Sequence, residues 1–165
     1  MAVHRLHNAD WGFDSNCFVC ESRNASGLQI PFHHDDEMHS VSAEFTLDDS
    51  FSGAPKFVHG GIVLAILDEA MAWATIAVGG KFAVTKDTSA TFDHPVRVGR
   101  TYRVEAFVDS ATDASMATRG TVLDAKHRPC VEARATFVVL SAATARAAIG
   151  DVTGEDVRLL RDAPS

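Results

Sequence analysis

The feature that most constrains the fold is a long apolar stretch that begins at two glycines. Residues 62–67 and 70–77 are apolar on nearly every face of a helix. A helix that is apolar all round is enclosed by other structure rather than lying on a surface. Gly79 and Gly80 follow it, and glycine suits the left-handed turn that ends many helices. We therefore predict one long buried helix from about Gly60 to Val78.

One carboxylate lies in the middle of this predicted helix. Asp68 is flanked by apolar residues, and a buried carboxylate is costly unless it is paired or used. Gly60 and Gly61 leave the helix N-terminus without side chains, and such an end can bind a negative oxygen. The combination favours an enzyme that acts on a carbonyl.

Strand-like segments lie on both sides of the predicted helix. Within 40–47, apolar Val41, Ala43 and Phe45 alternate with polar residues, the period of a half-buried strand. The short breaks between successive segments indicate antiparallel strands. We predict an α+β fold in which a curved antiparallel sheet of five to six strands wraps one helix. The predicted strands are 28–32, 40–47, 82–92, 101–110, 116–123 and 131–140.

The length of 165 residues predicts one domain. We expect residues 1–27 to form an N-terminal loop segment, because they are rich in turn-type residues. Residues 28–140 would form the folded domain. The remaining residues, 141–165, form a tail that either contains a short helix at 154–161 or is loose.

The composition limits the partners. A net charge of −7 argues against nucleic acid, although a local basic cluster can still bind a small anion. No apolar run reaches the roughly 20 residues of a membrane span, and the N-terminus lacks a signal core. These features and three cysteines without a disulfide framework predict a cytoplasmic protein that does not bind membranes. The basic residues near predicted turns are Arg97, Arg100, Arg119, Lys126 and Arg128.

Several motifs together resemble a known family. The string H-G-G-x-x-x-x-x-x-D-x-A at 59–70 resembles the signature of hotdog-fold acyl-CoA thioesterases of the phenylacetic-acid-degradation type. The similarity extends over roughly residues 15–140. Its other parts are Cys17-Phe18-Val19-Cys20, Gly27-Leu28, Val84-Thr85, His94-Pro95-Val96 and the ending at 135–140.

The resemblance implies hydrolysis of an acyl-CoA thioester by a homodimer or dimer of dimers, without a metal or other cofactor. Carried over by position, the backbone N–H of Gly60 polarises the thioester carbonyl. Asp68 is the essential carboxylate, either general base or nucleophile, and Thr85 places a water or the carboxylate. His59 and Gly61 are candidate substrate-binding residues, although His59 is equally suited to capping the helix. The pattern departs at Gly53, where some relatives carry Asn or Gln.

Helix geometry places the predicted active site between subunits. Gly60 and Asp68 are eight residues apart, so one α-helix separates them by about 12 Å. A single thioester carbonyl cannot contact both within one chain. We therefore expect the N–H donor to come from one subunit and Asp68 from its partner.

Alternatives remain open at this stage. Glu69 points about 100° away from Asp68 and is interpreted as structural or as a salt-bridge partner. Cys17-x-x-Cys20 suggests a zinc site, with His33, His34 or His39 as candidate further ligands, but no second C-x-x-C exists and packing in the N-terminal loop is the default interpretation. For function, the alternatives are a non-catalytic acyl-CoA-binding hotdog module and, with little pattern support, a dehydratase or hydratase.

Overall fold

The computed structural model describes residues 2–11 and 14–149. Two helices and seven strands make up the described part, together with two short 3₁₀ turns. The helices are α1 (Gly60–Ala77) and α2 (Ala142–Ile149). The strands are β1 (Val3–Arg5), β2 (His33–Asp35), β3 (Ser40–Thr46), β4 (Ala83–Phe92), β5 (Thr101–Ala111), β6 (Ser115–Leu123) and β7 (Pro129–Val139).

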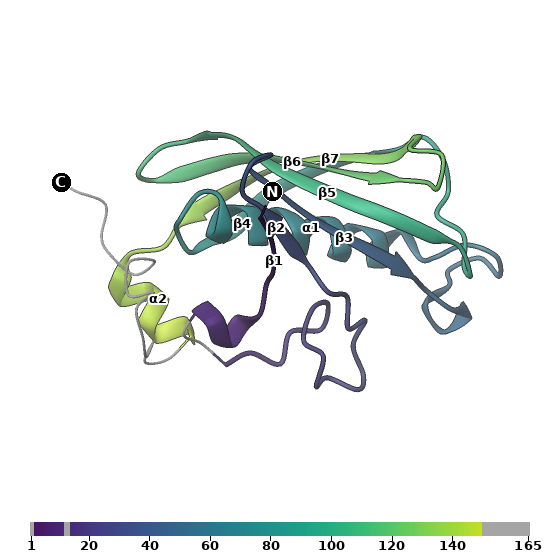
Figure 1. The fold of residues 1–165 in the computed structure, drawn as a ribbon, viewed down its shortest axis with the longest axis horizontal. Helices are drawn as coiled ribbons and strands as arrows, with labels where there is room; N and C mark the ends of the chain where they lie inside the picture. The colour runs from purple at the N-terminus through teal and green to yellow at the C-terminus, as the bar shows by residue number, and fades with distance from the viewer. Residues whose placement is uncertain (1, 12–13, 150–165) are drawn as a thin grey trace.

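All seven strands form one antiparallel sheet in the order β1-β2-β3-β5-β6-β7-β4. The sheet curves over α1, which lies against one of its faces (Figure 1). This arrangement confirms the predicted hotdog fold, although the sheet has seven strands instead of five to six, and the short strands β1 and β2 were not predicted. β4 pairs only with β7 within the described residues, so its other edge is open.

The core lies between α1 and the sheet. Ile66, Leu67 and Met71 of α1 are fully buried. Gly120 of β6 allows the close approach, because a Cβ there would lie 3.1 Å from Leu67 Cδ2 and 3.4 Å from Met71 Cγ. Phe137 of β7 is also buried, whereas its neighbour Val138 is 38% exposed on the opposite face.

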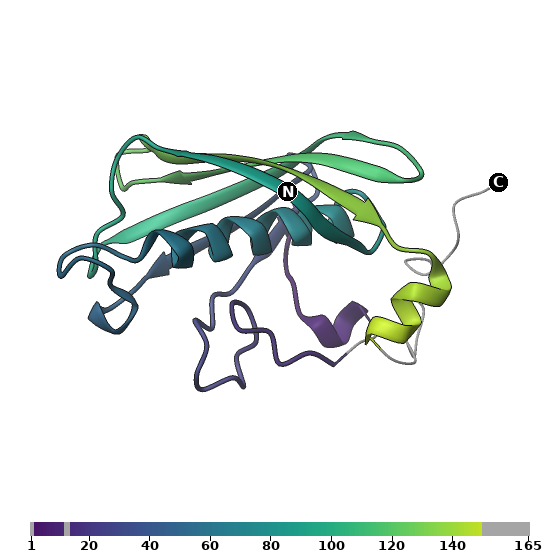
Figure 2. The same cartoon turned by 180° about the vertical axis from the view of Figure 1, so that it is seen from behind.

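After β1, most of the N-terminal segment runs on the side of α1 opposite the sheet (Figures 1 and 2). The prediction that residues 1–27 are all loop is wrong, because β1 and the 3₁₀ turn Asn8–Trp11 lie there. The strand predicted at 28–32 is also wrong. Gln29 has a φ of 54°, and the backbone N–H groups of Leu28 and Ile30 bond to Phe18 and Val19 instead of to a sheet neighbour.

The four long C-terminal strands and α1 agree with the predicted ranges to within two residues at each end. Gly80, with a φ of 71°, lies just after α1, as the predicted left-handed turn requires. The tail contains the helix α2, which was not predicted. The short helix predicted at 154–161 lies outside the described residues.

One face of α1 is not covered by the residues that the structure describes. α1 is long and apolar enough to cross a membrane, but core helices of soluble proteins share these properties. Within the structure 44% of α1 is buried. The open face includes Leu64, which is 36% exposed. The prediction of a helix enclosed on all sides is therefore met only in part within one chain.

Adjacent residues of β7 test which face of the sheet carries the core. We expect Phe137→Ala to lower the free energy of unfolding by about 3–5 kcal/mol, because it removes a fully buried aromatic ring. Val138→Ala is the matched control and should cost less than about 1 kcal/mol. Urea unfolding at one fixed protein concentration measures both. Equal losses in the two variants would contradict the assigned alternation.

Candidate functional site

The N-terminus of α1 presents one unused backbone donor. His59 caps the helix, and its Nδ1 accepts the N–H of Gly61 at 2.9 Å. The N–H groups of Ile62 and Val63 bond to the carbonyl oxygen of His59. The N–H of Gly60 has no acceptor among the described residues, and Gly60 is exposed. Of the two glycines, Gly60 is therefore the one available to a carbonyl oxygen.

The structure brings Asp68 and Thr85 together. Thr85 Oγ1, on β4, donates a hydrogen bond to Asp68 Oδ1 at 2.6 Å. The hydroxyl donor fixes the orientation of the carboxylate. Asp68 keeps part of its surface exposed, so the carboxylate is accessible rather than sealed in the core.

Asp68 lines a hollow between α1 and the open-edged strand β4. Its volume is about 380 Å³. The helix contributes the surface from Gly61 to Asp68, and β4 contributes Thr88, Ala90 and Phe92. The walls are thus mostly small or apolar, with one carboxylate, as suits an acyl group near a reacting centre. Gly60 itself does not line this hollow, in keeping with its distance from Asp68 along the helix.

Gly53, the position that departs from the resembled pattern, lies beside the helix cap. A Cβ there would stand 3.4 Å from the Cα of His59. An amide side chain at this position would therefore lie against the cap. This chain places no side-chain amide there.

A second, larger hollow of about 760 Å³ lies near the N-terminus of α1. Its basic residues are Arg97, Arg100, Lys126 and Arg128. Only Arg128 forms an ion pair within the described residues, with Asp124 at 3.0 Å. The hollow adjoins the helix entry, because Val58 N–H bonds to Val96 and the guanidinium of Arg97 stacks 5.3 Å from the ring of Phe57.

Arg119, the remaining basic candidate, lies away from this hollow. Its Nε pairs with Asp109 at 2.7 Å, and its guanidinium stacks on Phe107 at 4.1 Å. Arg134 also contacts Asp109, at 3.5 Å. Asp109 thus neutralises part of the charge at this second basic position.

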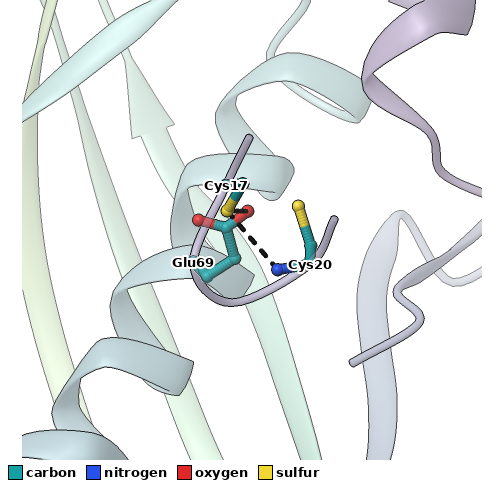
Figure 3. Close-up of side chains that lie close together, drawn as sticks. All are labelled: Cys17, Cys20 and Glu69. Carbon is teal, nitrogen blue, oxygen red and sulfur yellow. Dashed lines mark hydrogen bonds between the residues drawn. The ribbon is translucent and has the colours of Figure 1, made fainter. Parts of the chain in front are cut away.

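A third group of polar side chains joins the N-terminal segment to α1. Cys17, Cys20 and Glu69 place their possible ligand atoms within 4.8 Å of one another (Figure 3). A hydrogen bond of 3.2 Å links Cys17 Sγ and Glu69 Oε1. Burial, with the nearby thiol of Cys17, raises the pKa of Glu69 to about 8. The thiol of Cys20 and the backbone N–H groups of Cys20 and Val19 lower the pKa of Cys17.

This cluster corrects two interpretations made from the sequence. Glu69 forms no salt bridge within the described part of the chain, so only its structural interpretation holds. His33, His34 and His39 are not part of the group. The sequence offered no signal for the contact, because 52 residues separate Cys17 from Glu69.

Comparisons with known proteins give a family match for the central segment. Residues 56–131 match the family model of the thioesterase superfamily. These residues include α1, β4, β5 and β6, and so both Asp68 and Thr85. None of the curated proteins compared with the chain matches it.

Solved structures share the fold. Protein RHA08564, a thioesterase superfamily protein, is 25% identical with a TM-score of 0.70, over 74% of this chain and 60% of that one. This chain thus spans 60% of the length of that structure. A phenylacetic acid degradation-related protein from Ralstonia eutropha JMP134 is 23% identical (TM-score 0.61; 68% and 86% covered). Smu.793 from Streptococcus mutans UA159, bound to acetyl CoA, is 20% identical (TM-score 0.59; 62% and 82% covered).

Proposed function

We propose that this chain, with a thioesterase-superfamily segment at residues 56–131, hydrolyses acyl-CoA thioesters to the free acid and CoA. The observation that carries the proposal is the carboxylate of Asp68. It is held by Thr85 at 2.6 Å and lines a largely apolar hollow within that segment. The similarity to a structure that contains acetyl CoA supports the choice of thioester.

The reaction needs an activated oxygen nucleophile and a donor for the oxyanion. In one route Asp68 takes a proton from water, whose oxygen adds to the carbonyl carbon. In the other, Asp68 attacks the carbonyl carbon itself and water later hydrolyses the anhydride. In both, the N–H of Gly60 stabilises the carbonyl oxygen as it becomes negative. The C–S bond then breaks, and the CoA sulfur leaves as a thiolate that takes up a proton.

The complete site requires a second subunit. Gly60 and Asp68 lie about 12 Å apart along one helix, too far for one carbonyl to contact both. β4 offers an open edge, with Val84 and Phe92 exposed at 49% and 45%. An unpaired strand edge presents backbone N–H and C=O groups that can pair with another strand. Two β4 strands paired across a two-fold axis would cover the hollow and bring the partner's α1 alongside.

The basic hollow near the start of α1 suits the phosphates of CoA. Arg97, Arg100 and Lys126 have no acidic partner among the described residues, in a chain whose net charge is −7. Unpaired guanidinium groups bind phosphate oxygens strongly and in bidentate geometry. Phosphates bound there would hold the thioester near the helix N-terminus, where the N–H of Gly60 is free.

A non-catalytic acyl-CoA-binding module is the second candidate function. Gly53 favours it, because no side-chain amide is available there to bind the carbonyl or the water. The hydroxyl-held carboxylate favours turnover instead. The two candidates differ in whether thiol is released, which the first experiment below measures.

Asp68→Asn tests the carboxylate. The amide keeps the size of the side chain but removes its basicity and nucleophilicity, so we expect kcat to fall about 10²–10⁴-fold. Thiol release is measured with a panel of short, medium, long and aryl acyl-CoAs. Glu44→Gln, an exposed change on β3, is the control and should retain wild-type activity. If Asp68→Asn keeps wild-type activity, Asp68 has no part in the mechanism. If the wild type binds acyl-CoA but releases no thiol, the second candidate function is favoured.

Gly60→Pro tests the backbone donor. Proline lacks the N–H but is well tolerated at the first position of a helix, and the extended backbone of His59 (ψ 132°) accepts a following proline. We expect kcat to fall about 10²–10³-fold. Gly60→Ala keeps the N–H, and its Cβ would stand 3.9 Å from the ring of Phe92, an ordinary contact. It should therefore remain active, and equal losses in both variants would point to shape rather than the donor.

Mixed dimers distinguish a shared site from one within a chain. One subunit carries Gly60→Pro and the other carries Asp68→Asn, each with a different affinity tag. The two are co-expressed, and hybrid dimers are isolated by purification on both tags in turn. A shared arrangement leaves one intact site in each hybrid dimer, so we expect about half of the wild-type activity. Verified hybrids that are as inactive as the parent variants would exclude a site built across subunits.

Arg97→Ala combined with Arg100→Ala tests the basic hollow. We expect KM for an acyl-CoA to rise about 10-fold, because charge-assisted bonds to phosphate are lost. KM for the matching N-acetylcysteamine thioester, which lacks phosphates, should change little. Arg134→Ala, on the outer face of β7, should affect neither substrate. Equal effects on both thioesters would show that these arginines do not act through the phosphates.

A further inference from the structure

The turn at Cys17 is shaped to hold an anionic sulfur. The backbone N–H groups of Val19 and Cys20 both point to Cys17 Sγ, at 3.4 Å. Asn8 Nδ2 approaches Cys20 Sγ at 4.0 Å. The two backbone donors favour a thiolate at Cys17, whereas the hydrogen bond with Cys17 and burial raise the pKa of Cys20. The turn therefore does more than pack two partly buried cysteines.

Glu69 brings a carboxylate to the same point from α1. Figure 3 shows its carboxyl group beside Cys17, with Cys20 on the same turn. No Lys, Arg or His within residues 2–11 and 14–149 forms an ion pair with it. A mostly buried carboxylate beside two sulfurs, with no cationic side chain, gains most from a bound cation.

A small hollow beside the cluster has room for another ligand. Its volume is about 170 Å³, and Cys17, Glu69, Asn8 and Trp73 are among its lining residues. The indole N–H of Trp73 is buried and has no acceptor within the described residues. A water bound at this point would accept that N–H and complete a coordination shell.

We propose that Cys17, Cys20 and Glu69 bind one Zn²⁺ ion, with a water from the adjacent hollow as the fourth ligand. Two thiolates select a soft or borderline metal such as zinc over Mg²⁺ or Ca²⁺. With Zn–S near 2.3 Å and Zn–O near 2.1 Å, ligand atoms of a tetrahedral site lie about 3.5–3.8 Å apart. Cys17 Sγ and Glu69 Oε1 are 3.2 Å apart, and all the candidate ligand atoms lie within 4.8 Å of one another, so small side-chain shifts reach these values. Binding releases to solvent the protons carried by the thiols and the carboxyl.

The ion would fasten the N-terminal segment to α1. Cys17 and Cys20 belong to that segment, whereas Glu69 belongs to the helix and follows Asp68 directly. The cluster is separate from the hollow that Asp68 lines, since Cys17 and Glu69 line a different one. Its role is therefore structural, and its loss should lower stability before it alters the chemistry.

Metal content and stability test the proposal on the full chain. We expect one Zn²⁺ per chain by elemental analysis of protein purified under reducing conditions. Zinc added back to chelator-treated protein should raise Tm, because it binds the folded state. Cys20→Ser and Glu69→Gln should each weaken Zn²⁺ binding at least about 10-fold, and Cys130→Ser, which changes a cysteine outside the cluster, should bind normally.

Cobalt provides a spectroscopic readout that does not depend on folding yield. Co²⁺ bound to the wild-type chain should show sulfur-to-cobalt charge-transfer absorption, which should be absent in Cys20→Ser. A wild-type protein that takes up neither Zn²⁺ nor Co²⁺ and shows no change in Tm would overturn the proposal. So would a Cys17–Cys20 disulfide in the purified chain, detected as a mass lower by two hydrogens, because it would leave no thiolates for the metal.

Discussion

The structure depends on covering an apolar helix that one sheet cannot enclose. α1 buries Ile66, Leu67 and Met71 against the sheet, and burial of such side chains stabilises the fold by about 1.5–3 kcal/mol each. A sheet covers only one side of a helix, so the other sides of α1 need different partners. The N-terminal segment packs on one of them at Glu69, and the surface from Gly61 to Asp68 faces a hollow beside β4. Asp68 and Glu69 thus lie on sides of α1 that face different partners.

The sequence predicted the parts of the fold that local patterns determine. The range of α1 followed from its apolar run and from the glycines at both ends. β3 and the four long strands after α1 followed from alternating side chains and short turns. Patterns of period two and near four reflect burial on one face, and these elements bury one face against the core. The resemblance then indicated Asp68 and Thr85, which the structure places in hydrogen-bond contact.

The sequence failed where contacts distant along the chain decide the structure. The segment 28–32 has a strand-like composition, but its N–H groups bond to the turn at Phe18 and Val19, and Gln29 adopts a positive φ. No local pattern encodes that pairing. The same holds for Cys17 and Glu69, which belong to different elements and meet only because the N-terminal segment crosses α1. A C-x-x-C motif suggests a ligand pair, but spacing alone could not identify a glutamate as the third member.

Asp68 and Glu69 are adjacent on α1, but their carboxyl groups lie in different surroundings. Successive residues of an α-helix point about 100° apart. Asp68 therefore faces β4, where a hydroxyl orients it and part of its surface stays exposed. Glu69 faces the N-terminal segment, where burial without a cation raises its pKa to about 8. A carboxylate that must act as a base needs the first environment, because the second holds its proton at neutral pH. Geometry thus places the two carboxylates in different surroundings, and a cation beside Cys17 is what would make ionised Glu69 favourable.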